Sequence, residues 1–572
     1  MRIHPSMAGG PTERQAENSR SHGVPAWSGL GRAFCFYALA LAVALICLAN
    51  LGFLLGLAVG PWNLPLAAAL ALAGTWAWSR SAGGGAPAWR DALLGAGLVW
   101  AVLGLGLFLA TRYNDMSYDG QCYHQLAILS LLDGWNPLWE PYLPFHHYPV
   151  QNYPKAFWYL AVSLTQVFGS VEYGKAFNYL LPTVAGAALF QFLKGLGRSP
   201  FMVRLLLSLT AAFTPTVLCQ LNSFYLDGLL VSGLLLALVF SLEYYLYGDR
   251  RVLGPLLLVS LFLINLKYTG LVYVGLFQIG FWLALLWRRR QRHWAYFRCA
   301  AAGGLLGVLV LGFNPYVLNT VHFGSPVHPM PGENVARYQA PQEFIAKNRV
   351  EKLAWSLFAH CSANMKSMPQ LKIPFTVSAY EWEHLGTTSL RYSGLGPWFS
   401  GALILLPLAL LMVWRRNRAW AKAGLALCGL ILASVFFIPE TWFSRFVPQI
   451  WFIPLLWAVA LWWSPGEKWR AAARALAVAI CIILLVNQAM VLAGNWLDWH
   501  GVQSVFDGQV EDLRKASQTR QVLVKGPWRA VRNRLDSAGL RYEWVDELPC
   551  AEPQRIAGTH STHWYCLGEN TP

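Results

Sequence analysis

The residues best suited to chemistry lie together in one polar segment, TRYNDMSYDGQCYHQLAILSLLDGWNPL, which directly follows a long apolar stretch. Asp115 and Asp119 lie near its start, and Tyr123 and His124 follow within a few positions. A carboxylate close to an acceptor hydroxyl can take up its proton as a new bond forms. The segment therefore offers two candidate carboxylates for acid–base chemistry.

The same segment has helical periodicity. From Gly120 to Leu132, leucines recur at helical spacing with polar residues between them. This pattern predicts an amphipathic helix that lies in the membrane interface. Tyr123 follows Asp119 by four positions, so both side chains should face the same side of that helix. Capping of the helix N-terminus is an alternative role for Asp119, although capping and catalysis can coexist.

Three cations and a further carboxylate complete the set of candidates. Lys155 lies in NYPKA, Lys267 in NLKYTG and Arg445 in PETWFSRFVPQIW, while Asp227 lies in LNSFYLDG. Fixed cations at a membrane surface suit a phosphate that arrives with a lipid tail. The alternatives are contact with phospholipid headgroups and, for Lys155, a lysine that snorkels to the interface.

These side chains need a scaffold, and the chain supplies apolar runs of membrane-spanning length. We predict thirteen spans, each near the length that crosses about 30 Å of hydrocarbon. They cover 33–59, 62–79, 91–111, 176–194, 201–219, 227–247, 252–266, 270–287, 299–319, 396–414, 422–438, 447–464 and 474–494. The predicted fold class is thus an all-α polytopic membrane protein.

The positive charges alternate with these spans. With the N-terminus in the cytoplasm, Lys and Arg gather in every second connection, as in the run from Arg288 to Arg292. The other short connections nearly lack them, and Lys267 and Arg445 are the exceptions. This is the positive-inside pattern. It places the N-terminus inside, the C-terminus outside, and both exceptions on the outer face.

Composition agrees with a membrane protein of three parts. Of 572 residues, 56% are hydrophobic and only 13% are charged, about half the charged share of a soluble domain. In a soluble protein a net charge of +16 would raise the question of nucleic acid, but here topology takes precedence. We predict a disordered tail over 1–32, a membrane domain over 33–494 with outer loops 112–175 and 320–395, and an outer domain over 495–572.

The outer domain alternates strand-like and helical segments. QVLVKG precedes WRAVRNRLDSAGL, and RYEWVDEL and HWYCLG follow, which predicts a small α/β domain. Cys550 and Cys566 would lie in a compartment that permits disulfides, so we expect a bridge between them. No cysteine or histidine cluster has zinc spacing. His146 and His147 are weak ligand candidates, no cofactor is predicted, and a divalent cation stays an open alternative.

Several motifs together resemble the polytopic glycosyltransferases of the C superfamily (GT-C). DGQCYHQLAILSLLDGWNP is similar to the acidic-then-YH loop helix of the branch that holds protein mannosyltransferases and lipid A aminoarabinose transferases. NYPKA, NLKYTGL, NPYVLNTVHFGSPVHPM and SRFVPQIWFIPLLWAVAL resemble later segments of that branch, in the same order, over roughly residues 91–465. The chain departs from the family in having two spans ahead of the acidic loop's own span, and in GSPVHP at the Pro-rich turn.

The resemblance implies an enzyme of the cell envelope, in the inner (plasma) membrane with a periplasmic C-terminus. It would move a sugar from a polyprenyl-phosphate donor to an acceptor hydroxyl on a lipid, glycan or protein, with inversion. Asp119 would be the base, with Asp115 as the alternative. The lipid phosphate would be held by Lys155, Lys267 and Arg445. Tyr123 and His124 would line the sugar or acceptor site, and Asp227 would contact the acceptor.

Two other functions stay open. A transporter or lipid flippase would carry ionisable residues in mid-span around a central cavity, whereas the span centres here are nearly free of charge. A non-catalytic protein of polysaccharide assembly would tolerate replacement of Asp115 and Asp119.

Overall fold

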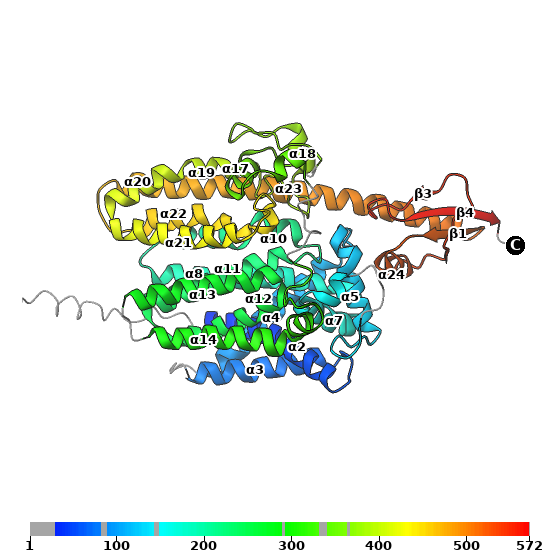
Figure 1. The fold of residues 1–572 in the computed structure, drawn as a ribbon, viewed down its shortest axis with the longest axis horizontal. Helices are drawn as coiled ribbons and strands as arrows, with labels where there is room; N and C mark the ends of the chain where they lie inside the picture. The colour runs from blue at the N-terminus through cyan, green and yellow to red at the C-terminus, as the bar shows by residue number, and fades with distance from the viewer. Residues whose placement is uncertain are drawn as a thin grey trace, which may run out of the picture.

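The chain forms a long bundle of helices with a small sheet at one end (Figure 1). The computed structural model describes residues 29–81, 88–141, 148–288, 292–330, 340–362 and 366–570. Most of the tail predicted over 1–32 lies outside the described residues. The first helix, α2 (Gly29–Leu54), begins before the predicted end of that tail.

Within the described residues, nine helices or joined helix pairs are long and apolar enough to cross a bilayer. Each is about as long as the hydrocarbon core requires or longer. They are α2, α4 (Ala88–Ala110), η2 with α8 (Val171–Ala176 and Phe177–Gly195), α11 (Asp227–Tyr247), α13 (Tyr268–Trp287), α14 with η4 (His293–Leu305 and Leu306–Leu311), α19 with α20 (Phe399–Ile404 and Leu406–Arg416), α21 (Arg418–Phe437) and α23 (Arg470–Ala516).

The other four predicted spans are also helical, but they are not among these nine. They correspond to α3 (Asn63–Ser81), α9 (Phe201–Ala212), α12 (Leu253–Leu266) and α22 (Phe452–Trp463). The prediction of helix is therefore confirmed at all thirteen places. The helical, membrane-like character of the fold is shown by nine segments, while the count of thirteen spans stays a prediction.

The helix α11 forms the centre of the bundle. Every residue from Asp227 to Ser241 is buried, which suits a helix that is apolar on nearly all sides. It packs against α8, α12 and α13, and the four lie side by side along the bundle in Figure 1. The helix ends where Gly248 adopts φ 65° in the left-handed region, a conformation that glycine adopts without steric penalty.

The first outer segment differs from its prediction. It contains η1 (Gly120–His124), α5 (Gln125–Leu132), α6 (Tyr148–Asn152) and α7 (Ala156–Phe168). Every residue from Gln125 to Leu131 is buried, so α5 is not a helix with one face in the membrane interface. The helix α7 was not predicted, and it packs against α5, η2 and α2.

Short helices make up the remaining connections. The bundle ends carry η3 (Arg250–Val252), α10 (Pro215–Gln220), η5 (Phe313–Val317), α15 (Leu318–Phe323), η7 (Ser444–Phe446) and η8 (Pro448–Trp451). The second outer segment contains α16 (Gln342–Ile345), α17 (Arg349–Phe358) and α18 (Ala379–His384). Asn348 and Ser378 begin α17 and α18 with complete capping boxes, which satisfy backbone N–H groups at each start.

The C-terminal region confirms the predicted order of elements. Its four strands are β1 (Arg520–Lys525), β2 (Glu543–Trp544), β3 (Gln554–Arg555) and β4 (Trp564–Asn570), in the order β2-β1-β4-β3. The pair β1–β2 is parallel, while β1–β4 and β3–β4 are antiparallel. The helix α24 (Arg529–Ser537) follows β1, and Cys550 and Cys566 form the expected disulfide.

The helical bundle and the C-terminal region share one helix. The chain does not break near residue 495, because α23 continues without interruption to Ala516 and reaches the sheet at the far end of the molecule (Figure 1). The core beneath the sheet includes Trp499 and Phe506 of α23, and also Met116 of the first outer segment. The sheet is thus packed onto the segment that carries the candidate carboxylates.

Candidate active site at one end of the bundle

Four chain segments that are far apart in sequence meet at the end of the bundle nearest the sheet. Asp119 directly precedes η1, Asp227 is the first residue of α11, Lys267 joins α12 to α13, and Arg445 lies in η7. The backbone of Lys267 is extended, with φ −158° and ψ 147°. This extended residue separates two helices and places the ammonium group at their junction.

Asp119 and Arg445 form the central ion pair of the site. Arg445 Nη1 donates to Asp119 Oδ2 at 3.0 Å, across 326 positions of sequence. The Asp119 side chain is 22% exposed and the Arg445 side chain is 14% exposed, so a ligand can reach both. The Asp119 side chain makes no capping hydrogen bond to η1. The alternative in which it only caps that helix is therefore wrong.

Aromatic rings enclose the Arg445 guanidinium. Its Cζ lies 4.7 Å from the ring centroid of Tyr225, 5.0 Å from that of Phe443 and 5.2 Å from that of Phe446. Burial lowers the pKa of Arg445, but the facing carboxylate of Asp119 more than offsets this and raises it above the ordinary value. Arg445 is thus a permanent, oriented positive charge.

Lys267 and Asp227 form a second ion pair beside the first. Lys267 Nζ donates to Asp227 Oδ1, and Gln220 donates to Asp227 Oδ2 at 3.3 Å. The ammonium of Lys267 lies 5.1 Å from the Phe446 ring centroid, and this is the ring that Arg445 also contacts. The two pairs therefore share one aromatic wall. Asp227 is buried, and one of its oxygens already accepts from Lys267. Both features oppose the predicted contact of Asp227 with an acceptor.

Tyr123 and His124 follow Asp119 in η1, and their rings pack together. Their ring centroids are 4.2 Å apart, and the Tyr153 ring lies 6.0 Å from that of Tyr123. Trp158 Nε1–H donates to His124 Nδ1 at 2.8 Å, so the imidazole proton lies on Nε2. Burial, aided by the charge of Lys267, lowers the pKa of His124 to about 3. The ring is thus a neutral donor near neutral pH.

Asp115 is more deeply buried than Asp119, and its carboxylate accepts hydrogen bonds from backbone N–H groups. Its Oδ1 accepts from Ser117 N at 2.8 Å and its Oδ2 accepts from Phe224 N at 2.7 Å, and the residue is 0% exposed. Arg534 of α24 donates to the Asp115 carbonyl oxygen at 2.8 Å. Asp115 therefore holds the loop against the segment before α11 and against the C-terminal domain, and Asp119 is the more accessible of the two candidate carboxylates.

The environment of Asp115 predicts an unusual dependence of stability on pH. Burial and the nearby charge of Glu172 raise its pKa from 3.8 to about 6. The folded protein then binds this proton more tightly than the unfolded chain, so the free energy of unfolding falls as pH rises from about 4 to about 6. The expected change is on the order of 3 kcal/mol.

Thermal unfolding of the detergent-solubilised protein at about pH 4 and about pH 7 tests this. The stability of the wild type minus that of Asp115→Asn should be larger at the lower pH than at the higher pH. The control is Asp133→Asn, which removes an exposed carboxylate paired with Arg529 and should give the same difference at both pH values. A wild-type advantage over Asp115→Asn that does not change with pH would contradict the assignment.

Lys155 does not join the site. Its Nζ donates to Gln151 O, Tyr153 O and Asn314 Oδ1 at 2.8, 2.9 and 2.8 Å. An ammonium group has three hydrogens, so these three acceptors use all of them. Contrary to the prediction, Lys155 has no donor left for a lipid phosphate. It is also no snorkelling surface lysine, because it is buried and ties the loop before α7 to η5.

Arg391 is a site residue that the sequence did not reveal. Ser444 N donates to Arg391 O at 3.3 Å and Arg445 N donates to Leu390 O at 3.2 Å, so the two arginines lie on paired backbone segments. Burial lowers the pKa of Arg391, and the charges of Arg445 and Asp119 also act on it. The one sequence signal was an arginine shortly ahead of a predicted span in the second outer segment.

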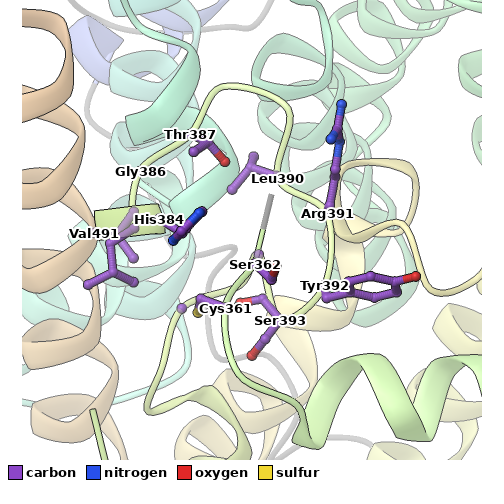
Figure 2. Close-up of a pocket in the computed structure, with 13 residues that line it drawn as sticks. Cys361, Ser362, His384, Gly386, Thr387, Leu390, Arg391, Tyr392, Ser393 and Val491 are labelled. Carbon is purple, nitrogen blue, oxygen red and sulfur yellow. Dashed lines mark hydrogen bonds between the residues drawn. The ribbon is translucent and has the colours of Figure 1, made fainter. Parts of the chain in front are cut away.

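A small cavity lies beside Arg391 (Figure 2). Cys361, Ser393 and Val491 contribute to its wall, and the Arg391 side chain points away from Ser393 in the view. The cavity measures about 10 Å³, which is room for about one water molecule. It is therefore no sugar site, and it separates Arg391 from α23.

The C-terminal domain also contacts the loop that carries Asp119. Gln121 Nε2 donates to Gly558 O at 2.9 Å, and His560 Nε2 lies 2.9 Å from Met116 O. The Tyr118 ring packs edge-on against Trp528, with 5.3 Å between ring centroids. These contacts fix the loop on both sides of Asp119, so the domain helps to orient the carboxylate.

The site is rich in cations. Arg445 pairs with Asp119, Lys267 pairs with Asp227, and Arg391 lies on the backbone segment that pairs with Arg445. Three cations with two carboxylates suit a bound anion. Among the described residues, no group of three or more His, Cys, Asp or Glu side chains could hold a metal ion. His146 and His147 lie outside the described residues. Within the part that is described, the chemistry available is a carboxylate that accepts a proton and fixed cations that stabilise a phosphate.

Comparison of the chain with protein-family models gives no match. Comparison with curated proteins gives no match either. Any assignment of function therefore depends on the residues of the candidate site.

Proposed function

We propose that the protein is a membrane-embedded glycosyltransferase that moves a sugar from a polyprenyl-phosphate donor to an acceptor hydroxyl. The observation that carries the proposal is the ion pair of Asp119 with Arg445, beside Lys267, whose ammonium lies over the same Phe446 ring as the Arg445 guanidinium. The GT-C resemblance of the motifs that supply Asp119, Lys267 and Arg445 supports the same reading. Arg391 replaces Lys155 in the phosphate-binding set.

The chemistry requires one base and several cations. The acceptor O–H attacks the anomeric carbon while the bond from that carbon to the phosphate oxygen breaks, and the configuration inverts. The proton passes to Asp119, for which we assign Oδ1, because Oδ2 faces Arg445. The electron pair of the broken bond stays on the phosphate, where fixed guanidinium and ammonium groups stabilise the developing charge.

The position of the site suits a lipid-linked donor. The site lies at the N-terminal ends of α11 and α13, whereas Arg250, Arg251 and Arg288 follow the opposite ends of these helices. Arginine-rich ends face the cytoplasm in multi-pass proteins. We therefore place the site at the outer surface of the inner membrane, with thirteen spans and a periplasmic C-terminal domain. A donor whose tail lies in the bilayer would present its phosphate at this level.

Purified protein in lipid vesicles tests the proposal. A panel of polyprenyl-phosphate-linked sugars is supplied with membrane extract as the source of acceptor. With one donor, we expect free polyprenyl phosphate and glycosylated acceptor to form in equal amounts. The control for protein-independent donor breakdown is vesicles without protein. If intact donor crosses the bilayer without release of polyprenyl phosphate, the protein is a flippase and the proposal fails.

A further inference from the structure

A large apolar cavity lies at the end of the bundle opposite the candidate active site. It is lined by α8, α9, α11, α13, α21 and α22, is open on one side, and measures about 760 Å³. Figure 1 shows α8, α11 and α13 in one group and α21 and α22 in another, and residues of both groups line the cavity. Most of its wall is leucine, valine, alanine and phenylalanine.

The cavity begins some way along α11 from Asp227, the residue of that helix that belongs to the candidate active site. On α11 its lining begins at Leu235 and continues to Tyr247, whereas Asp227 begins that helix. At 1.5 Å per residue, Leu235 is about 12 Å and Tyr247 about 30 Å from Asp227 along the helix axis. Most of the cavity therefore lies more than half of the ~30 Å hydrocarbon thickness away from the site, on the side of the other leaflet.

The cavity has one polar end. Tyr245, Tyr247, Arg288 and Trp420 line it there, at the C-terminal ends of α11 and α13 and the start of α21. The Arg288 guanidinium lies 5.0 Å from the Tyr245 ring centroid and is exposed. The remaining wall offers few polar groups. Such a cavity matches a molecule with an anionic head and a long hydrocarbon chain.

The cavity should be neither filled with water nor empty. Water inside a protein needs two to four polar partners, and the leucine-rich wall does not supply them. An apolar void of this size would leave the lining side chains without van der Waals partners on one side. Hydrocarbon is the available filling at the depth of these helices, because it surrounds membrane-spanning segments.

We propose that this cavity binds an anionic glycerophospholipid of the leaflet that faces the arginine-rich helix ends. One acyl chain lies between α11, α13, α21 and α22, and the phosphate contacts Arg288. The proposal rests on membrane insertion, and only the choice of a phospholipid over a polyprenyl phosphate rests on the proposed sugar transfer. A polyprenyl phosphate is disfavoured, because its phosphate belongs with Arg445 and Lys267 at the other end of the bundle.

Lipid retention tests the proposal. The detergent-purified protein is incorporated into nanodiscs of phosphatidylglycerol and phosphatidylcholine in equal amounts, re-extracted, and analysed by native mass spectrometry. We expect the wild type to retain phosphatidylglycerol. Arg288→Gln should still retain lipid but lose about fivefold in preference for phosphatidylglycerol, the effect of one Lys or Arg near an anionic surface.

A second variant fills the cavity. Ala284 of α13 and Ala423 of α21 both line it, so Ala284→Phe with Ala423→Phe should abolish retention of either lipid. The matched control is Ala101→Phe, at an exposed position of α4, which should retain lipid as the wild type does. Equal retention by the filled variant and the control would overturn the proposal.

Photocrosslinking gives a measurement that does not depend on folding of a variant. Phosphatidylglycerol with a photoreactive acyl chain, added to the wild type, should label peptides of α21 and α22. Labelling confined to α3, α4 or α14 would contradict the site. Displacement of the bound phosphatidylglycerol by equimolar polyprenyl phosphate would overturn the choice of a phospholipid.

Discussion

Asp119→Asn is expected to lower sugar transfer by about 100- to 10,000-fold, the range that general-base catalysis contributes. The asparagine has the size of aspartate, and its amide oxygen can still accept from Arg445, so the loop should keep its shape. What is lost is the negative charge that takes up the acceptor proton. The rate of transfer at saturating donor and acceptor is the measurement.

The controls for Asp119 come from the same loop. Asp133→Asn removes a carboxylate that is 55% exposed and paired with Arg529, and it should leave the rate unchanged. Asp115→Asn should act mainly through stability, since both of its oxygens accept from backbone N–H groups. Full activity in Asp119→Asn would remove Asp119 from the mechanism. Loss of activity in a well-folded Asp115→Asn alone would move the base to Asp115.

Arg445→Met is expected to lower kcat/KM for the donor by about 100- to 1,000-fold, as when one preorganised charge-stabilising donor is removed. Methionine keeps an unbranched side chain among Tyr225, Phe443 and Phe446 but carries no charge. Arg445→Lys should recover part of the loss, because it restores the charge without the planar fork of the guanidinium. Kinetics with the donor varied at fixed acceptor measure both effects.

A double variant separates catalysis from simple loss of the ion pair. If Arg445 acted only by holding Asp119, Asp119→Asn combined with Arg445→Met would be no worse than the more impaired single variant. If Arg445 also binds the donor phosphate, the double variant should be less active than either. Arg529→Gln, which breaks the surface pair with Asp133, is the control for a lost cation. Unchanged donor kinetics in a folded Arg445→Met would contradict the phosphate-binding role.

Helix positions could be predicted along the whole membrane region. A membrane helix satisfies its own backbone hydrogen bonds, so an apolar run of suitable length is enough to identify it. The order of elements around β1 and α24 was predicted for a similar reason, since alternation and helical period are local patterns. The bridge between Cys550 and Cys566 followed from the compartment that the charge pattern implied.

Burial of these elements could not be predicted in the same way. The leucines of α5 indicated a helix, but α7 and the C-terminal domain cover the side that was expected to face the interface. The length of α23 was also missed, because its polar second half is helical through packing against the sheet. In both cases the neighbours, which are far away in sequence, decide the outcome.

The candidate site shows the same division. Residue type and the predicted membrane side selected Asp119, Lys267 and Arg445 as candidates, since a cation on the predicted outer face breaks the charge pattern. Their pairing was not predictable: Asp119 meets Arg445 across 326 positions and Lys267 meets Asp227 across 40. For the same reason Lys155, which was expected to bind a phosphate, instead ties two loops together. Arg391, to which no role was assigned, lies on the backbone segment that pairs with Arg445. A side chain's partners depend on which helix ends the bundle brings together, and that is a property of packing rather than of local pattern.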